Sequence, residues 1–141
     1  MALEALQQGL LPTDEIKPER TWGNSRFDLS YRLGELTGFI EVKGVTLEEA
    51  AIAYFPAAPT ERGAKHILEL CHAQQEGFRG HIWFIVQMAG IREFRPNDRT
   101  DSAFGAALRQ GAAAGLDIRA FGCQVTPQGL TLAEEIPVQL T

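Results

Sequence analysis

Three residues of types that carry out phosphate chemistry lie at regular spacing near the start of the chain: Asp28, Glu41 and Lys43. If Gly34 and Glu35 form a two-residue turn, the flanking segments pair so that Asp28 lies opposite Glu41, with Lys43 two residues further on the same face. Directly opposed carboxylates repel each other unless something compensates. Carboxylate oxygens, water and a phosphate are ligands that Mg²⁺ takes, and a lysine beside such a cation can stabilise charge on the phosphate.

The same spacing has a second interpretation. Lys43 between two acids also fits a cross-strand salt-bridge cluster on a solvated surface, and Asp, Glu and Lys are the usual surface residues. The spacing by itself favours this alternative, so the metal site depends on further observations.

Strict alternation of apolar and polar residues predicts the two strands that must position these groups. Residues 26–33 and 36–43 both alternate, and Gly34 is expected at positive φ in the turn between them. The apolar face of this hairpin, opposite the two acids and the lysine, is expected to carry Phe27, Leu29, Ile40 and Val42.

The remaining pattern predicts further elements around this hairpin. Leucines at helical spacing predict a helix over residues 1–10, Thr60 is the expected N-cap of a helix over residues 60–76, and a third helix follows Thr100 or Asp101. Strands are expected at residues 81–88, 118–125 and 130–132, the first of them covered on both faces. This order predicts one α/β domain over residues 1–141, with a mixed sheet flanked by helices.

Composition restricts the classes of function. The 141 residues include 13 basic and 18 acidic side chains, a net charge of −5, which argues against coating nucleic acid by bulk attraction. The longest apolar run, residues 82–91, is far shorter than the roughly 20 residues that a membrane span needs. The start of the chain lacks the features of a signal peptide, and the two cysteines form no metal or disulfide motif, so we expect a cytoplasmic protein that does not contact a membrane.

Several stretches resemble the sugar fermentation stimulation protein A family of bacteria and archaea. They cover essentially the whole chain, and the part from Phe55 to His66 is a long and specific signature. The stretches are SRFD at 25–28, IEVKGVTL at 40–47, YFP at 54–56, TERGAKHILEL at 60–70 and PVQL at 137–140.

The resemblance implies a restriction-endonuclease-like core of the PD-(D/E)xK type, DNA binding, and a regulatory link to sugar (maltose) metabolism. It makes Asp28 and Glu41 ligands of Mg²⁺ or Mn²⁺ and Lys43 the catalytic lysine, and it adds Glu4 of the first helix as a further acidic ligand. Phe27 stands where the wider superfamily has its proline. Family members also carry an N-terminal oligonucleotide-binding-type barrel; because Met1 falls inside the first helix, we expect that barrel to be absent, with a partner as one possible source of it.

Basic residues near the predicted site are candidates for contact with nucleic acid. Arg62 and Lys65 lie at i, i+3 on the polar side of the second helix, with His66 beside them, and Arg26 precedes the acidic strand residue. The alternative for the helical pair is a solvated face with i, i+4 partners, and both interpretations stay open.

The leading hypothesis is therefore a DNA-binding protein of this family that keeps an acidic metal site. The alternative is an active Mg²⁺- or Mn²⁺-dependent phosphodiester hydrolase, that is, a nuclease. Whether the chain is an enzyme is left open by the sequence.

Overall fold

The computed structural model describes residues 15–22, 25–127 and 129–141. The predicted first helix and the proposed ligand Glu4 lie outside the described residues. No described helix has the length and apolar character needed to cross a membrane.

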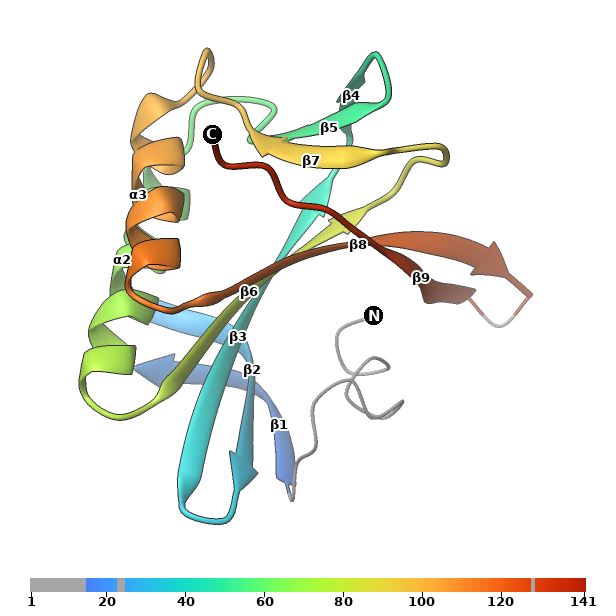
Figure 1. Cartoon of the computed structure of the whole chain (residues 1–141). Coiled ribbons are helices and arrows are strands. Elements are labelled where there is room, and N and C mark those ends of the chain that lie inside the picture. Colours follow the sequence, from blue (N-terminus) through green and yellow to red (C-terminus); the bar gives the residue numbers. More distant parts are fainter. Residues whose placement is uncertain (1–14, 23–24, 128) are drawn as a thin grey trace.

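A six-stranded mixed sheet forms the centre of the described fold (Figure 1). β2 pairs antiparallel with β1 and β3, whereas β3, β6 and β8 are parallel to one another, and β9 returns antiparallel to β8. The parallel pairing across β3, β6 and β8 is the expected consequence of two strand–helix–strand crossovers. In sheet order the strands are β1 (Glu15–Trp22), β2 (Ser25–Leu33), β3 (Leu36–Val45), β6 (Arg79–Val86), β8 (Asp117–Thr126) and β9 (Gly129–Ile136).

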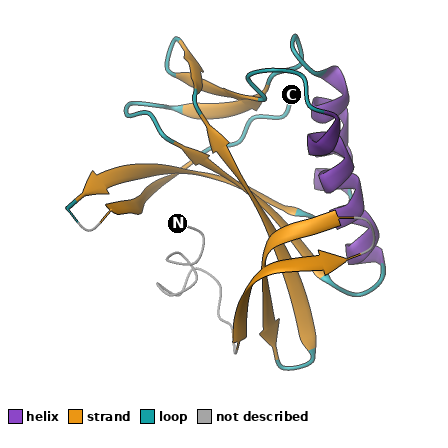
Figure 2. Cartoon of the chain, turned by 180° about the vertical axis from the view of Figure 1, so that it is seen from behind, coloured by secondary structure: helices purple, strands orange, loops and turns teal. Residues whose placement is uncertain are grey.

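Two helices, α2 (Glu61–Gln75) and α3 (Ser102–Ala113), cover one face of this sheet (Figure 2). Both begin at the residues that the sequence indicates. The Thr60 hydroxyl accepts from the Gly63 N–H at 3.1 Å, and the Asp101 carboxylate accepts from the Phe104 N–H at 3.0 Å. These bonds satisfy backbone donors that have no partner within the helix.

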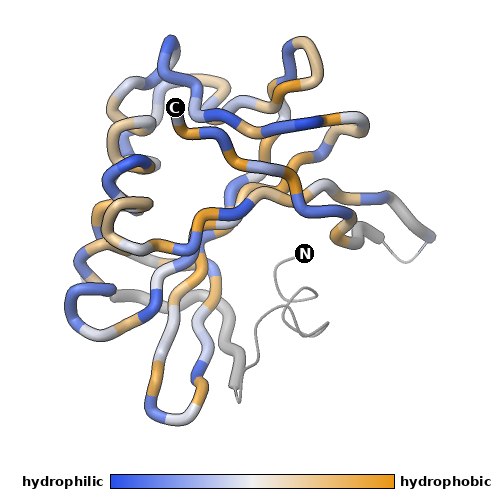
Figure 3. The backbone as a smooth tube through the Cα atoms, viewed as in Figure 1, coloured by the Kyte–Doolittle hydropathy of each residue, from blue (hydrophilic) through white to orange (hydrophobic). Residues whose placement is uncertain are grey.

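Apolar side chains on the two faces of the sheet form two separate cores. Along β6 they alternate: Ile82 and Phe84 belong to the core beneath the helices, and Trp83 and Ile85 to the core on the opposite face. The prediction of a strand buried on both faces is confirmed. Figure 3 shows the hydrophobic stretches along the middle of the sheet and hydrophilic residues in the loop that precedes α3.

The hairpin between β2 and β3 follows the predicted register, with one correction. Leu33 pairs with Leu36 and Leu29 with Ile40, and Gly34 has φ +62°, as expected. Phe27, however, lies in the core beneath the helices, whereas Leu29 and Ile40 lie in the opposite core. The regular pairing of β2 with β3 ends at Leu29, so the regular alternation of faces ends there as well.

A second sheet of three short strands was missed by the sequence reasoning. It consists of β4, β5 and β7, with β5 antiparallel to β4 and parallel to β7. Strands of three or four residues are too short to show a period-two pattern. Their bounds are Leu47–Glu49, Ile52–Phe55 and Glu93–Pro96.

Candidate functional site

β2, β3 and α2 bring four side chains together beneath the helices: Asp28, Glu41, Lys43 and His66. The centre is Glu41, whose residue is only 3% exposed. Its Oε2 atom lies 2.9 Å from Lys43 Nζ and 2.5 Å from His66 Nδ1. Lys43 Nζ and His66 Nδ1 lie 3.4 Å apart. One buried carboxylate oxygen is thus shared by a lysine from its own strand and a histidine from the helix above.

Asp28 reaches this group through its side chain. The backbone pairing of β2 with β3 extends only to Leu29, the residue after Asp28 in the chain. The Asp28 Oδ2 atom accepts a hydrogen bond from the Val42 N–H at 2.8 Å. The carboxyl groups of Asp28 and Glu41 also share a hydrogen bond. The structure therefore brings Asp28, Glu41 and Lys43 together as predicted, although Asp28 and Glu41 do not form a regular cross-strand pair.

The pKa of Asp28 reflects the presence of a second acid, Glu41, at the same site. Partial burial and the hydrogen bond with Glu41 raise the pKa of Asp28 to about 6, against the opposing effects of the Val42 N–H and the Lys43 charge. A hydrogen bond between two carboxyl groups requires that one of them holds a proton. A divalent cation can take the place of that proton and remove the repulsion, so the two acids fit the proposed metal ligands.

His66 was assigned to the polar side of its helix by the sequence reasoning, and this was wrong. The residue is 9% exposed and shares the buried side of α2 with Gly63, Ile67 and Leu70. Burial, together with the charges of Lys43 and Arg62, lowers the pKa of His66. The spacing 63, 66, 67 and 70 is the usual apolar stripe of a helix, and this signal was sufficient to find a polar residue facing the core.

The basic residues predicted to contact nucleic acid lie on two elements, α2 and β2. Arg62 and Lys65 are exposed on α2, and both lie near enough to His66 for their charges to lower its pKa. Arg26 belongs to β2 next to the acidic strand position. Glu61 is exposed in the first turn of α2, where a negative charge is favourable.

The described residues contain no group of three or more His, Cys, Asp and Glu side chains arranged to hold a metal ion. Two of the three predicted ligands, Asp28 and Glu41, are in contact. The third, Glu4, lies outside the described part of the chain.

The class of protein follows from this arrangement: a mixed α/β domain whose described residues form two sheets and two helices, with a cluster of two acids, a lysine and a histidine between the larger sheet and α2. A family model described as "Sugar fermentation stimulation protein RE domain" matches residues 1–129. The chain belongs to this family.

Individual relatives agree with that assignment. A sugar fermentation stimulation protein homolog of Clostridium acetobutylicum is 47% identical over 128 residues, which cover 89% of this chain and 55% of that protein. A homolog from Thermoanaerobacter sp. (strain X514) is 40% identical over 144 residues, covering 99% of this chain and 63% of that protein. The chain thus spans somewhat more than half the length of these relatives.

A solved structure of Pyrococcus furiosus SfsA in complex with Ca²⁺ has the same fold. It superimposes with a TM-score of 0.87 at 30% identity, covering 96% of this chain and 61% of that one. The Ca²⁺ belongs to that protein.

Proposed function

We propose that this chain is a divalent-cation-dependent nucleic-acid phosphodiester hydrolase, with DNA as the first substrate to test, on a restriction-endonuclease-like core of the PD-(D/E)xK type. The observation that carries the proposal is the convergence of Asp28, Glu41 and Lys43: Lys43 Nζ lies 2.9 Å from Glu41 Oε2, and Asp28 Oδ2 accepts from the N–H of Val42, the residue between Glu41 and Lys43. Oxygen ligands of this kind suit Mg²⁺ or Mn²⁺. A relative solved with Ca²⁺ supports a divalent cation in this family.

Each side chain has a role that its chemistry allows. Asp28 and Glu41 are the ligands that would hold the cation, and Glu4 is a further candidate. The bound cation supplies Lewis-acid polarisation of the phosphate and of an attacking water. Lys43 carries a positive charge beside Glu41 and stabilises the negative charge that develops on the phosphate in the transition state.

Contacts to the nucleic-acid backbone are proposed for Arg62 and Lys65 on the exposed side of α2 and for Arg26 on β2. Phosphate contacts of this kind position a substrate and carry no sequence information. With few such contacts and a net charge of −5, binding to duplex DNA should be weak, about micromolar or poorer, and should fall steeply with salt. Nanomolar binding by this chain alone at about 0.15 M salt would contradict this expectation.

A second candidate function is DNA binding without hydrolysis, in a cytoplasmic protein that regulates sugar metabolism. The names of the curated relatives, sugar fermentation stimulation protein homologs, favour it. Under this candidate the cation and Lys43 hold a phosphate in place but do not promote its cleavage. Additional DNA contacts would come from sequence beyond this chain or from a partner, because the chain covers only 55% to 63% of these relatives.

The deciding experiment measures cleavage and binding on the same substrates. Fluorescent single- and double-stranded DNA and RNA are incubated with the chain in Mg²⁺, Mn²⁺, Ca²⁺ or EDTA, and binding is followed by anisotropy. We expect cleavage in Mg²⁺ or Mn²⁺ and none in EDTA. Lys43→Ala should lower turnover by about 10³-fold, roughly the loss of one transition-state stabilising group, while most cation binding remains.

Arg99→Ala is the matched control, because its side chain is 79% exposed and pairs with Glu49, outside the cluster. It should cleave as the wild type does. Cation-dependent binding without cleavage of any substrate would establish the second candidate, and neither binding nor cleavage would reject both.

A further inference from the structure

His66 is a buried side chain of the site, and the proposed function gives it no role. It comes from α2, whereas the two acids and the lysine come from β2 and β3. We propose that His66 is the positioning residue that fixes the Glu41 carboxylate for cation binding and, through it, keeps Lys43 beside the cation. This inference rests on the proposed function.

The first argument is that the contacts from His66 and Lys43 both go to the same oxygen of Glu41. Its Oε2 atom is contacted both by His66 Nδ1 at 2.5 Å and by Lys43 Nζ at 2.9 Å. The other oxygen takes part in neither of these contacts. A carboxylate held by two donors on one oxygen cannot rotate freely, so its second oxygen keeps a fixed direction.

The second argument is the direction of the hydrogen bond. A single ring nitrogen, Nδ1 of His66, lies near both Glu41 Oε2 and Lys43 Nζ. An ammonium group has no acceptor capacity and a carboxylate has no donor, so Nδ1–H donates to Glu41 and the 3.4 Å approach to Lys43 is proximity rather than a second bond. A donating N–H on a ligating carboxylate is the usual arrangement around metal centres.

The third argument is that α2 is tightly packed against its own N-cap and against α3 at this point. A methyl group added at Gly63 would lie 2.8 Å from Thr60 Cγ2 and 3.0 Å from Phe104 Cδ2. Ile67, next to the histidine, is fully buried. The backbone that carries His66 is therefore anchored on both sides, which is what a residue needs in order to orient another.

The test uses two amide variants that differ in where they place a donor. The Asn amide reaches the position of the histidine Nδ1, whereas the longer Gln amide reaches the position of Nε2, so His66→Asn keeps the donor to Glu41 and His66→Gln misplaces it. Mn²⁺ affinity is measured by calorimetry without nucleic acid, thermal stability is measured in EDTA, and kcat and KM for DNA are measured in Mn²⁺. His72→Asn is the matched control, since His72 lies on the exposed side of the same helix.

We expect His66→Gln to weaken Mn²⁺ binding by about 10- to 100-fold, the usual effect of losing an outer hydrogen bond to a ligand. His66→Asn should stay within about threefold of the wild type, and the control should not change. kcat should fall in His66→Gln while KM for DNA stays the same, because the histidine acts through Glu41 and not on the substrate.

The outcomes separate this inference from the proposed function. If the wild type binds no Mn²⁺, the proposed function and this inference both fail. If the wild type binds Mn²⁺ and His66→Gln binds it equally well, the inference alone is overturned. Equal losses of affinity in the Asn and Gln variants, each with a lowered melting temperature in EDTA, also overturn it, because they mean that the histidine only maintains the fold.

Discussion

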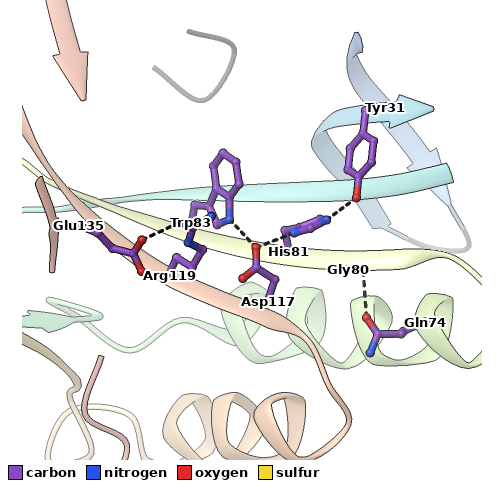
Figure 4. Close-up of polar contacts among 8 residues, drawn as sticks. All are labelled: Tyr31, Gln74, Gly80, His81, Trp83, Asp117, Arg119 and Glu135. Atoms are coloured by element: carbon purple, nitrogen blue, oxygen red, sulfur yellow. Dashed lines mark hydrogen bonds and ion pairs between the residues drawn. The ribbon is translucent and has the colours of Figure 1, made fainter. Parts of the chain in front are cut away.

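Two buried histidines on opposite faces of the same sheet each contact a carboxylate, with different consequences. His66 lies beneath α2 and contacts Glu41 at 2.5 Å, and His81 lies on the sheet face opposite α2 and α3 and contacts Asp117 at 2.7 Å. The first pair belongs to the candidate site, where a second acid, Asp28, adds negative charge. The second pair belongs to a network that links three strands of the sheet (Figure 4).

In the network every polar group meets a complementary one. The Tyr31 hydroxyl lies 2.6 Å from His81 Nε2, and the Trp83 indole N–H donates to Asp117 at 3.2 Å. Burial alone would raise the pKa of Asp117, but the hydrogen bonds from His81 and Trp83 bring it below its usual value. The acid is stable in its charged form, and nothing in the arrangement calls for a further ligand.

In the site, the effects that raise the pKa of the acid outweigh those that lower it. The pKa of Asp28 is raised to about 6, so its charged form is the unfavourable one. Groups whose pKa is shifted this way by burial and a like charge gather at functional sites, whereas satisfied buried networks mainly specify the fold. The comparison therefore favours a stabilising role for the network and supports the ligand binding proposed for the site.

The largest effect on stability should come from breaking the network. His81→Leu removes the partner of Tyr31 and of Asp117 at once and leaves the buried tyrosine hydroxyl and the half-buried carboxylate each short of a bond. We expect a loss of about 3 kcal/mol in the free energy of unfolding. Chemical denaturation followed by circular dichroism measures it.

His72→Leu, on the exposed side of α2, is the control and should change stability by less than about 0.5 kcal/mol. A loss below about 1 kcal/mol in His81→Leu would remove the distinction between the network and the site.

At the site, replacing Asp28 should change the free energy of unfolding by a smaller amount and in the opposite direction, toward higher stability. The folded-state pKa of Asp28, about 6, lies above the ordinary value of 3.8, so its favourable contribution is present below pH 3.8 and is lost as the pH rises through 6. Asp28→Asn resembles the protonated acid. In EDTA the variant should match the wild type at pH 4 and exceed it at pH 7 by about 1 kcal/mol, after allowance for solvent screening of this exposed residue.

The measurement is a series of denaturation curves from pH 4 to 7, repeated with Mn²⁺. The cation should raise the melting temperature of the wild type and leave Asp28→Asn nearly unchanged, because the variant has lost a ligand. Asp117 provides the contrast: its pKa is lowered, so its contribution is lost only as the pH falls below its ordinary value of 3.8. A destabilised Asp28→Asn, with no cation-dependent shift in the wild type, would make the cluster a salt bridge only.

The smallest expected effect comes from Tyr31→Phe. The ring stays in place over Gly38, and only the hydroxyl that bonds His81 Nε2 is removed. We expect a loss of about 1 kcal/mol in the free energy of unfolding and no change in Mn²⁺ affinity. Thermal melts and calorimetry on the same preparation test both. A loss of Mn²⁺ affinity in this variant would show that the two regions are coupled through the sheet.

The sequence by itself determined the elements whose signals are local. The alternation in residues 26–33 and 36–43, with Gly34 between them, predicted the hairpin and its register as far as Leu29. Thr60 and Asp101 predicted where α2 and α3 begin, because a capping side chain acts on backbone groups three residues away. The placing of Glu41 and Lys43 on one side of β3 follows from these local rules, whereas the position of Asp28 lies beyond the regular pairing.

Only the tertiary structure decided which residues meet across long distances in the chain. His66 reaches Glu41 from 25 positions away, and Tyr31 reaches His81 from 50 positions away. Neither contact can be predicted from the periodicity of apolar residues. This periodicity indicates that a residue on a helix or strand is buried, but it does not indicate which residue it contacts. The same reason explains Phe27, whose change of face depends on where the pairing of β2 with β3 ends and not on its neighbours in sequence.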